Sequence, residues 1–244
     1  MIKKVVIVTG ASRGIGLATV ELLMNSGYEV FALSRSSPKE AGARIHCVKG
    51  ELSDLIKGKD EELPQWLQQL LGREEIKNAS SIALVHNAAV LAKDSVESLK
   101  GEELLEILKV NIAAPQELNR QLIPYMKEGS SIIYIGSTLS EKAVKNSFSY
   151  VTSKHAFAGM MRATCQDLAG KGIHTALICP GFTDTEMLRG HVGKEAAVID
   201  AIKGMVTFGR LIRPEEIATI VKTAIENPVC NGSIWHAHLG QIGC

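Results

Sequence analysis

The chain has 244 residues, 45% of them apolar, and carries 27 basic side chains against 26 acidic ones. This length suits one large α/β domain or two small ones, and the apolar content suffices for a substantial core. Because the charges nearly cancel, the overall field does not favour binding to nucleic acid or to an anionic membrane surface, so an anionic ligand has to be bound locally.

The cysteines and the N-terminus bear on the cellular compartment. The five cysteines are scattered and lack CxxC or zinc-finger spacing, which predicts free thiols in a reducing compartment. The N-terminal apolar stretch is soon interrupted by Thr9 and Gly10, and it is too short for a signal peptide or a membrane span. We therefore expect a cytoplasmic protein.

Short apolar runs alternate with longer stretches of helical periodicity, which is clearest over residues 17–24, 102–118 and 150–168. Continuous apolar strands bounded by turn residues are typical of a parallel sheet covered on both faces. We predict a single α/β domain over residues 1–244, doubly wound, with a parallel sheet of about seven strands and helices on both faces. The apolar runs begin at Val5, Val30, Ile45, Ser81, Ser131, His174 and Gly232.

The first apolar run leads directly into a glycine-rich turn, "VTGASRGIG", and then into a helix. Glycines let the backbone turn tightly and approach a pyrophosphate, and the helix N-terminus adds unpaired N–H groups and a positive dipole end. Strand, turn and helix in this order predict a dinucleotide site, although the spacing is GxxxGxG and not the common GxGxxG. Its predicted contacts are Gly10, Ser12, Arg13, Gly14, Ile15 and Gly16.

The second strand ends in "LSRSS", where an NAD site usually has an acid for the ribose 2′-hydroxyl. Arg35, joined by Arg13 from the glycine turn, offers cationic groups where a carboxylate would repel a 2′-phosphate. This pattern predicts NADP(H) as the cofactor. The alternative is that Arg35 is an ordinary surface charge.

Residues 183–206 have a looser pattern, with apolar residues set among glycine and charge. Two interpretations are open: an ordinary surface helix pair, or a mobile apolar lid over a substrate. The segment that follows, "RPEEIATIVKTAIE", predicts a helix with Pro214 at its first position and acidic residues in its first turn.

Six motifs in order resemble those of the classical short-chain dehydrogenases/reductases along nearly the whole chain. The resemblance implies a Rossmann fold and an NADP(H)-type carbonyl reductase, in a family where homodimers and homotetramers are common. The motifs are TGxxxGxG at residues 9–16, His86-Asn87-Ala88-Ala89 for the usual NNAG, Asn111 in "KVNIAAP", Ser137 in "IYIGS", the YxxxK pair Tyr150 and Lys154, and "CPGFTDT" with Thr185.

Carbonyl reduction needs a proton donor and a stabilising hydrogen bond at the substrate oxygen, because hydride transfer leaves charge there. Tyr150 is the predicted donor. A free phenol has a pKa of about 10, and we expect Lys154, one helical turn on, to lower it. The resemblance adds Ser137 as the group that holds the substrate oxygen, a bond from Lys154 to the nicotinamide ribose, and Asn111 as the anchor of a proton-relaying water.

The resemblance also implies further cofactor contacts. Residues after the sixth strand would grip the nicotinamide carboxamide, and "KGEL" stands where the family has an acid and an apolar residue against the adenine. The contacts implied are Glu51, Leu52, Asn87, Ala88, Ala89, Pro180, Gly181, Thr183 and Thr185, besides Tyr150 and Lys154.

Two regions depart from the family pattern. Ala89 replaces a glycine, which requires ordinary backbone angles there. The C-terminal "IWHAHLGQIGC" replaces a VDGG-like ending, which puts the subunit contacts and the pocket wall in doubt. His236 and His238 share a strand face, but no acidic or cysteine partner stands at ligand spacing, so we predict no metal site.

We therefore expect an NADP(H)-dependent oxidoreductase that transfers hydride between nicotinamide and a ketone, diketone or 3-oxoacyl-like substrate. Its partners would be a small carbonyl or alcohol molecule and further copies of the chain. The alternative is a protein that binds NADP(H) or a partner on the same fold without turnover. The apolar residues between Met187 and Met205 favour an uncharged substrate, with a slight preference for small diketones or pterins.

Overall fold

The computed structural model describes residues 3–36, 44–56, 62–193 and 195–242. The strands are β1 (Lys4–Thr9), β2 (Glu29–Ser34), β3 (Ile45–Lys49), β4 (Ser81–His86), β5 (Ser131–Ile135), β6 (His174–Pro180) and β7 (Ser233–Ala237). The α-helices are α1 (Gly14–Asn25), α2 (Gln65–Leu71), α3 (Glu74–Lys77), α4 (Gly101–Leu108), α5 (Ala114–Leu122), α6 (Phe148–Asp167), α7 (Glu186–Val192), α8 (Ala196–Gly204) and α9 (Pro214–Glu226).

The seven strands form one parallel sheet in the order β3-β2-β1-β4-β5-β6-β7. Each predicted apolar run forms one strand, so the doubly wound prediction is confirmed. The strand order changes direction between β1 and β4, where Val8 pairs with Val85. In open α/β sheets, ligands bind at the carboxyl ends of the strands beside such a switch point.

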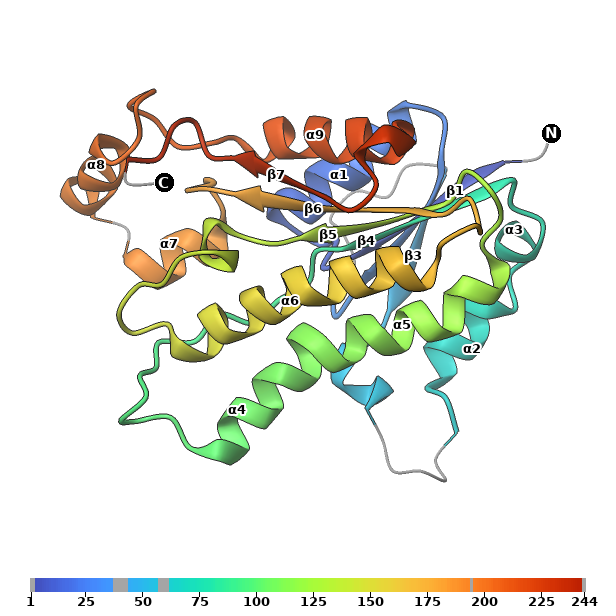
Figure 1. The fold of residues 1–244 in the computed structure, drawn as a ribbon, viewed down its shortest axis with the longest axis horizontal. Coiled ribbons are helices and arrows are strands. Elements are labelled where there is room, and N and C mark those ends of the chain that lie inside the picture. Colours follow the sequence, from blue (N-terminus) through green and yellow to red (C-terminus); the bar gives the residue numbers. More distant parts are fainter. Residues whose placement is uncertain (1–2, 37–43, 57–61, 194, 243–244) are drawn as a thin grey trace.

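Helices cover both faces of the sheet because successive strand residues point to opposite sides. Val6 and Val8 of β1 belong to the core under α1 and α9, whereas Val5 and Ile7 belong to the core under α2, α5 and α6. All four valine and isoleucine side chains are fully buried. In Figure 1, α1 and α9 lie above the sheet, and α4, α5 and α6 lie below it.

The long helix predicted over residues 102–118 is interrupted. One turn of π-helix, η2 (Lys109–Ala113), joins α4 to α5 and contains Asn111. Such a turn inserts a residue into the helix and is frequent at functional sites. By contrast, α9 begins at Pro214 as predicted, and the Glu216 carboxylate accepts a hydrogen bond of 2.8 Å from the Arg213 amide.

Residues 183–206 fold as a helix pair, α7 and α8, that lies beyond the carboxyl ends of the strands (Figure 1). A small apolar cluster of Ile199, Ile202 and Leu211 holds it, with Phe182 and Leu188 packed against them. The surface helix pair of the sequence prediction is thus observed, and a movement of the pair as a lid stays a prediction.

Cysteine chemistry and membrane spans were also predicted from sequence. The four cysteines among the described residues, Cys47, Cys165, Cys179 and Cys230, are free thiols as predicted, and Cys244 lies outside the described residues. Within the described ranges, no helix is both long enough and apolar enough to cross a membrane.

Candidate functional site

The glycine turn between β1 and α1 has the backbone that a phosphate site needs. Gly10 and Gly14 have φ values of +65° and +55°, and a Cβ at Gly16 would overlap the carbonyl oxygen of Gly10. Arg13 begins α1 without a side-chain capping bond, so its side chain does not occupy the first amide groups of this helix. Uncapped amides at a helix N-terminus fit a pyrophosphate, so this turn suits a dinucleotide.

Thr9 fastens the carboxyl ends of β1 and β4 together. Its buried Oγ1 accepts hydrogen bonds from the amides of Asn87 (2.9 Å) and Ala88 (3.0 Å). The Asn87 side chain in turn donates to the carbonyl oxygens of Thr9 (3.0 Å) and Gly10 (3.1 Å). Ala89 is not among the described non-glycine residues with positive φ, so its methyl group is accommodated. Thr9 was not among the predicted site residues, although it opens the glycine motif.

Both cations predicted for a 2′-phosphate have a carboxylate beside them. Arg13 Nη1 lies 2.7 Å from Glu186 Oε2 at the start of α7, and Arg35 Nε lies 3.7 Å from Glu51 Oε2. Both arginine side chains are more than half exposed. Arg35 and Glu51 therefore lie together after β2 and β3, whereas Arg13 points to the helix pair. Leu52, beside Glu51, is buried.

The segment after β6 lies over the glycine turn. A Cβ at Gly14 would stand 3.1 Å from Thr185 Cγ2, and the Thr185 hydroxyl accepts the Leu188 amide at 3.2 Å to cap α7. Thr183 Oγ1 donates to the Gly181 carbonyl at 3.1 Å. The segment after Pro180 thus approaches the glycine turn at Thr185.

Tyr150, Lys154 and Ser137 come together at the carboxyl end of β5. Tyr150 and Lys154 lie on α6, and both are buried. The Lys154 Nζ donates to the Ile135 carbonyl oxygen at 2.7 Å and lies 5.4 Å from the centre of the Tyr150 ring. Ser137, just past the end of β5, hydrogen-bonds the Tyr150 phenol. The predicted donor, cation and hydroxyl are therefore neighbours.

Burial is the largest influence on the pKa values of Tyr150 and Lys154. It raises the pKa of Tyr150 to about 12, against the hydrogen bond from Ser137, which lowers it. Burial also lowers the pKa of Lys154 to about 8. The phenol pKa therefore lies above its ordinary value in this structure and not below it as expected, because the loss of water and the nearby Cys179 outweigh the hydrogen bond from Ser137. The structure therefore keeps Tyr150 protonated at neutral pH.

Asn111 fastens the segment after β4 to α6. Its Oδ1 accepts from the Val90 amide at 2.8 Å, and its Nδ2 donates to the Val90 carbonyl and to Ser153 Oγ, each at 3.0 Å. The side chain thus bonds to Val90 and Ser153, and its anchoring of a water for Lys154 stays a prediction.

The altered C-terminal segment reaches the same end of the sheet. His238 packs against Gly181, where a Cβ would stand 2.8 Å from its own. His236 pairs with Cys179 in the register of β6 and β7, and its Nε2 lies 3.4 Å from Glu141 Oε2. Sequence spacing gave these histidines no acidic partner, and the fold brings Glu141 to His236 from a distant segment. Among the described residues, the ligand atoms of His236, His238 and Glu141 do not lie close enough together to form a candidate metal site.

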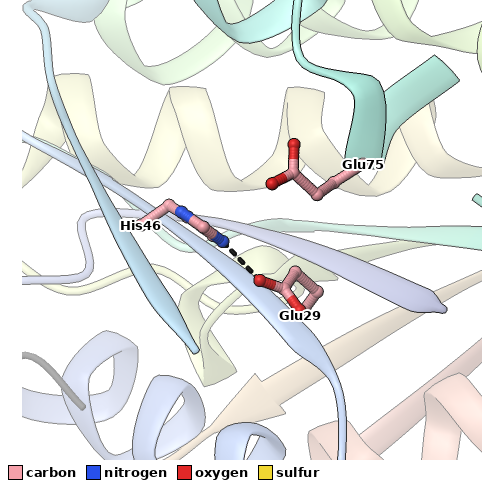
Figure 2. Close-up of side chains that lie close together, drawn as sticks. All are labelled: Glu29, His46 and Glu75. Carbon is pink, nitrogen blue, oxygen red and sulfur yellow. Dashed lines mark hydrogen bonds and ion pairs between the residues drawn. The ribbon is translucent and has the colours of Figure 1, made fainter. Parts of the chain in front are cut away.

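A second cluster of possible metal ligands lies at the opposite, amino end of the strands. Figure 2 shows Glu29, His46 and Glu75, whose nearest ligand atoms all lie within 4.8 Å of one another. Glu29 bonds to His46 Nε2 and accepts from Lys3 Nζ at 2.6 Å, while Arg73 lies 3.0 Å from Glu75 and 3.2 Å from His46 Nδ1. Two cations thus already balance the two carboxylates, so we interpret the cluster as an ion network that fastens β2, β3 and α3.

The comparisons with known proteins identify the family of this chain. A profile described as short chain dehydrogenase matches residues 4–196. Carbonyl reductase family member 4 of Xenopus laevis is 27% identical over 235 residues, which cover 95% of this chain and 94% of that protein. The FabG 3-oxoacyl-(acyl-carrier-protein) reductase of Escherichia coli is 28% identical over 226 residues, covering 89% and 88%. The ligand-free structure of Thermoplasma acidophilum aldohexose dehydrogenase has a TM-score of 0.86 at 28% identity, covering 98% and 94%.

Solved structures with the same fold carry either nicotinamide dinucleotide. A short chain dehydrogenase of Burkholderia cenocepacia in complex with NADP has a TM-score of 0.82 at 22% identity. 4-Hydroxyisoleucine dehydrogenase complexed with NADH has a TM-score of 0.83 at 21% identity. The chain belongs to the short-chain dehydrogenase family, and it is an oxidoreductase that acts on carbonyl or alcohol substrates with NAD(P)(H).

Proposed function

We propose that this protein is an NADP(H)-dependent carbonyl reductase with Tyr150, Lys154, Ser137 and Asn111 as its catalytic set. The observation that carries the proposal is the meeting of a buried phenol, a buried ammonium group and a serine hydroxyl at the carboxyl end of β5. A protein that only binds a dinucleotide would not need a proton donor there. The runner-up, an NADP(H)-sensing or partner-binding protein without turnover, leaves this set unexplained.

The proposed chemistry starts from the protonated phenol. When bound, the dinucleotide supplies hydride to the substrate carbon or takes it up in the reverse direction. Tyr150 donates its proton to the substrate oxygen, and Ser137 orients that oxygen by a hydrogen bond. The Lys154 ammonium, 5.4 Å from the phenol ring centre, stabilises the negative charge left on the phenolate. Alcohol oxidation would use the same groups in reverse.

The contacts proposed for the dinucleotide follow the carboxyl ends of the strands. The uncapped N-terminus of α1 would hold the pyrophosphate, and the turn from Pro180 to Thr185 would hold the nicotinamide. Arg35 and Arg13 would bind the 2′-phosphate, since guanidinium groups suit phosphate oxygens. Binding would exchange their carboxylate partners, Glu51 and Glu186, for the phosphate.

For the substrate we propose a small ketone or diketone, taken under the helix pair over residues 183–206 as a lid. Met187, Val198 and Met205 leave more than a third of their surfaces exposed on this pair, which favours an uncharged carbonyl compound. The relatives named above include both a carbonyl reductase and a reductase of 3-oxoacyl groups on a carrier, so both classes belong in the test.

The test is NADPH consumption by the purified protein against diketones, aldehydes, 3-oxoacyl thioesters and pterins, run beside Tyr150→Phe. We expect turnover of one class, and a loss of roughly 10²- to 10⁴-fold in kcat for the variant with unchanged NADPH binding. Normal turnover by Tyr150→Phe would exclude the phenol as the acid. Tight NADPH binding without turnover of any class would favour the sensing protein. NADH measured in parallel decides the cofactor preference.

A further inference from the structure

The segment that follows the predicted cofactor residues 87–89 is bonded twice to the catalytic helix α6. At its start, Val90 exchanges two hydrogen bonds with Asn111, whose Nδ2 also donates to Ser153 Oγ at 3.0 Å. At its end, Asp94 forms a parallel bridge with Ser147, the residue before α6. The two attachments flank Tyr150 in the sequence of the helix.

Asp94 makes the attachment nearest to the phenol. Its carboxylate accepts the Ser149 amide at 2.9 Å and also the Ser149 hydroxyl, and both residues are buried. Its main chain adds bonds to the Asn146 carbonyl at 3.2 Å and from the Phe148 amide at 3.3 Å. A carboxylate at the first turn of a helix satisfies amides that have no partner within the helix and is favoured by the helix dipole. This attachment ends one residue before Tyr150.

The side chain of Ser147 makes no capping bond to α6, so Asp94 supplies from a distant segment what a capping residue usually supplies locally. Asn146, the residue before Ser147, has a φ of +59°, a conformation uncommon for a residue other than glycine. The bonds from Asp94 are therefore the contacts that determine where the first turn of α6 begins. Because Tyr150 lies in that turn, they also determine where its side chain stands relative to Ser137.

We propose that Asp94 is a positioning residue, which through Ser149 holds Tyr150 at the place where it meets Ser137 and the substrate oxygen. The inference rests on the proposed function for the role of Tyr150. A shift of about 1 Å in a reacting group can cost roughly 10²-fold in rate, so a positional effect of this kind is measurable.

The experiment compares the full-length protein with Asp94→Asn, Ser149→Ala and the double variant. Asparagine keeps one oxygen for the Ser149 amide but loses the charged bond to the hydroxyl, and Ser149→Ala removes only the hydroxyl. We expect roughly a tenfold fall in kcat for Asp94→Asn and a smaller fall for Ser149→Ala, with NADPH Kd unchanged. The double variant should match the larger single effect, because both changes remove the same bond.

The matched control is Glu216→Gln. Glu216 also accepts a backbone amide at a helix N-terminus, that of α9, but this helix carries none of the proposed catalytic residues. We expect its thermal stability to fall while kcat stays unchanged. Equal kcat losses in Asp94→Asn and Glu216→Gln would overturn the positioning role and leave a structural one. Additive effects of Asp94→Asn and Ser149→Ala would do the same.

Hydrogen exchange at the Ser149 amide gives a readout that does not depend on turnover. Since this amide bonds to Asp94 and lies in the first turn, its exchange should speed up in Asp94→Asn and stay slow in Glu216→Gln. Unchanged exchange would overturn the proposal even if kcat fell. If the wild-type protein turned over no carbonyl, the proposed function and the assignment of Asp94 to it would fail, whereas faster exchange would still show that Asp94 holds α6.

Discussion

The two ends of the sheet differ in whether a buried charged group has partners of opposite charge. At the amino end, the buried Glu29 carboxylate is paired with Lys3 and His46, within the ion network of Figure 2. At the carboxyl end, the buried Lys154 ammonium bonds to a neutral carbonyl, that of Ile135. In the part of the chain that the structure describes, no carboxylate forms an ion pair with it.

The pKa values follow from this difference. Burial by itself would raise the pKa of Glu29, but the bonds from Lys3 and His46 lower it below the usual value. For Lys154 the effect of burial is larger than the opposing effect of the Cys179 thiol, and the pKa falls to about 8. A balanced network fixes the charge state and fastens strands, whereas an unbalanced buried cation can change its charge state near neutral pH. Unbalanced groups of this kind concentrate at functional sites.

The largest expected effect comes from Lys154→Met, which removes the unbalanced charge. We expect kcat to fall by at least roughly 10²-fold, because the phenolate then loses the cation beside it. The apoprotein should become more stable at pH 7 by about 1–2 kcal/mol, since a desolvated cation is lost and an unpaired carbonyl at Ile135 offsets part of the gain. Activity assays and urea unfolding measure the two effects. A variant that is both inactive and less stable would contradict the comparison.

The second prediction is a fall in the reduction rate at alkaline pH. Lys154 is charged below its pKa of about 8 and neutral above it, so kcat/KM should decrease about tenfold per pH unit beyond that value. Tyr150, with a pKa of about 12, stays protonated throughout.

Between about pH 8 and pH 10.5 Lys154 is protonated in the unfolded chain but not in the folded one, so the stability of the wild-type protein should rise with pH there. In Lys154→Arg, which stays charged, any residual rate should not decrease over the same range.

The third prediction concerns the balanced end. Glu29→Gln leaves Lys3 and His46 without their carboxylate and should lower the free energy of unfolding by about 2 kcal/mol at pH 7, with kcat unchanged. Because the folded-state pKa of Glu29 is lowered, its contribution is present above the unfolded-state pKa and is lost as pH falls through the folded-state value. The difference from wild type should therefore shrink in acid. Urea unfolding at neutral and acid pH would show a constant difference if the charge did not matter.

The sequence predicted those parts of the molecule that depend on local pattern. The seven apolar runs became strands, α9 began at Pro214, and Tyr150 and Lys154 share a helix face because they stand four residues apart. The glycine turn was recognisable for the same reason, since its strand, turn and helix are contiguous in the chain.

The rest depends on contacts between distant segments. Asp94 lies 55 residues from Ser149. Glu141, which follows β5, comes to His236 of β7 only because β5 and β7 flank β6 in the sheet. The direction of the Tyr150 pKa was also missed, because the four-residue spacing from Lys154 does not reveal that the phenol is buried. The signal that could have indicated Asp94 was an acidic residue soon after the fourth strand, and nothing local identified its partner.

The smallest expected effect extends the comparison to an exposed charge pair at the carboxyl end. Arg13 and Glu186 are both more than half exposed, so their ion pair contributes little to stability. Under the proposed NADP(H) preference, Glu186 competes with the 2′-phosphate for Arg13, and Glu186→Gln should lower the NADPH Kd about two- to fivefold with the NADH Kd unchanged. Fluorescence titration at low and high salt measures this. The gain should shrink as salt rises, and an equal gain for both dinucleotides would show that Arg13 does not distinguish the 2′-phosphate.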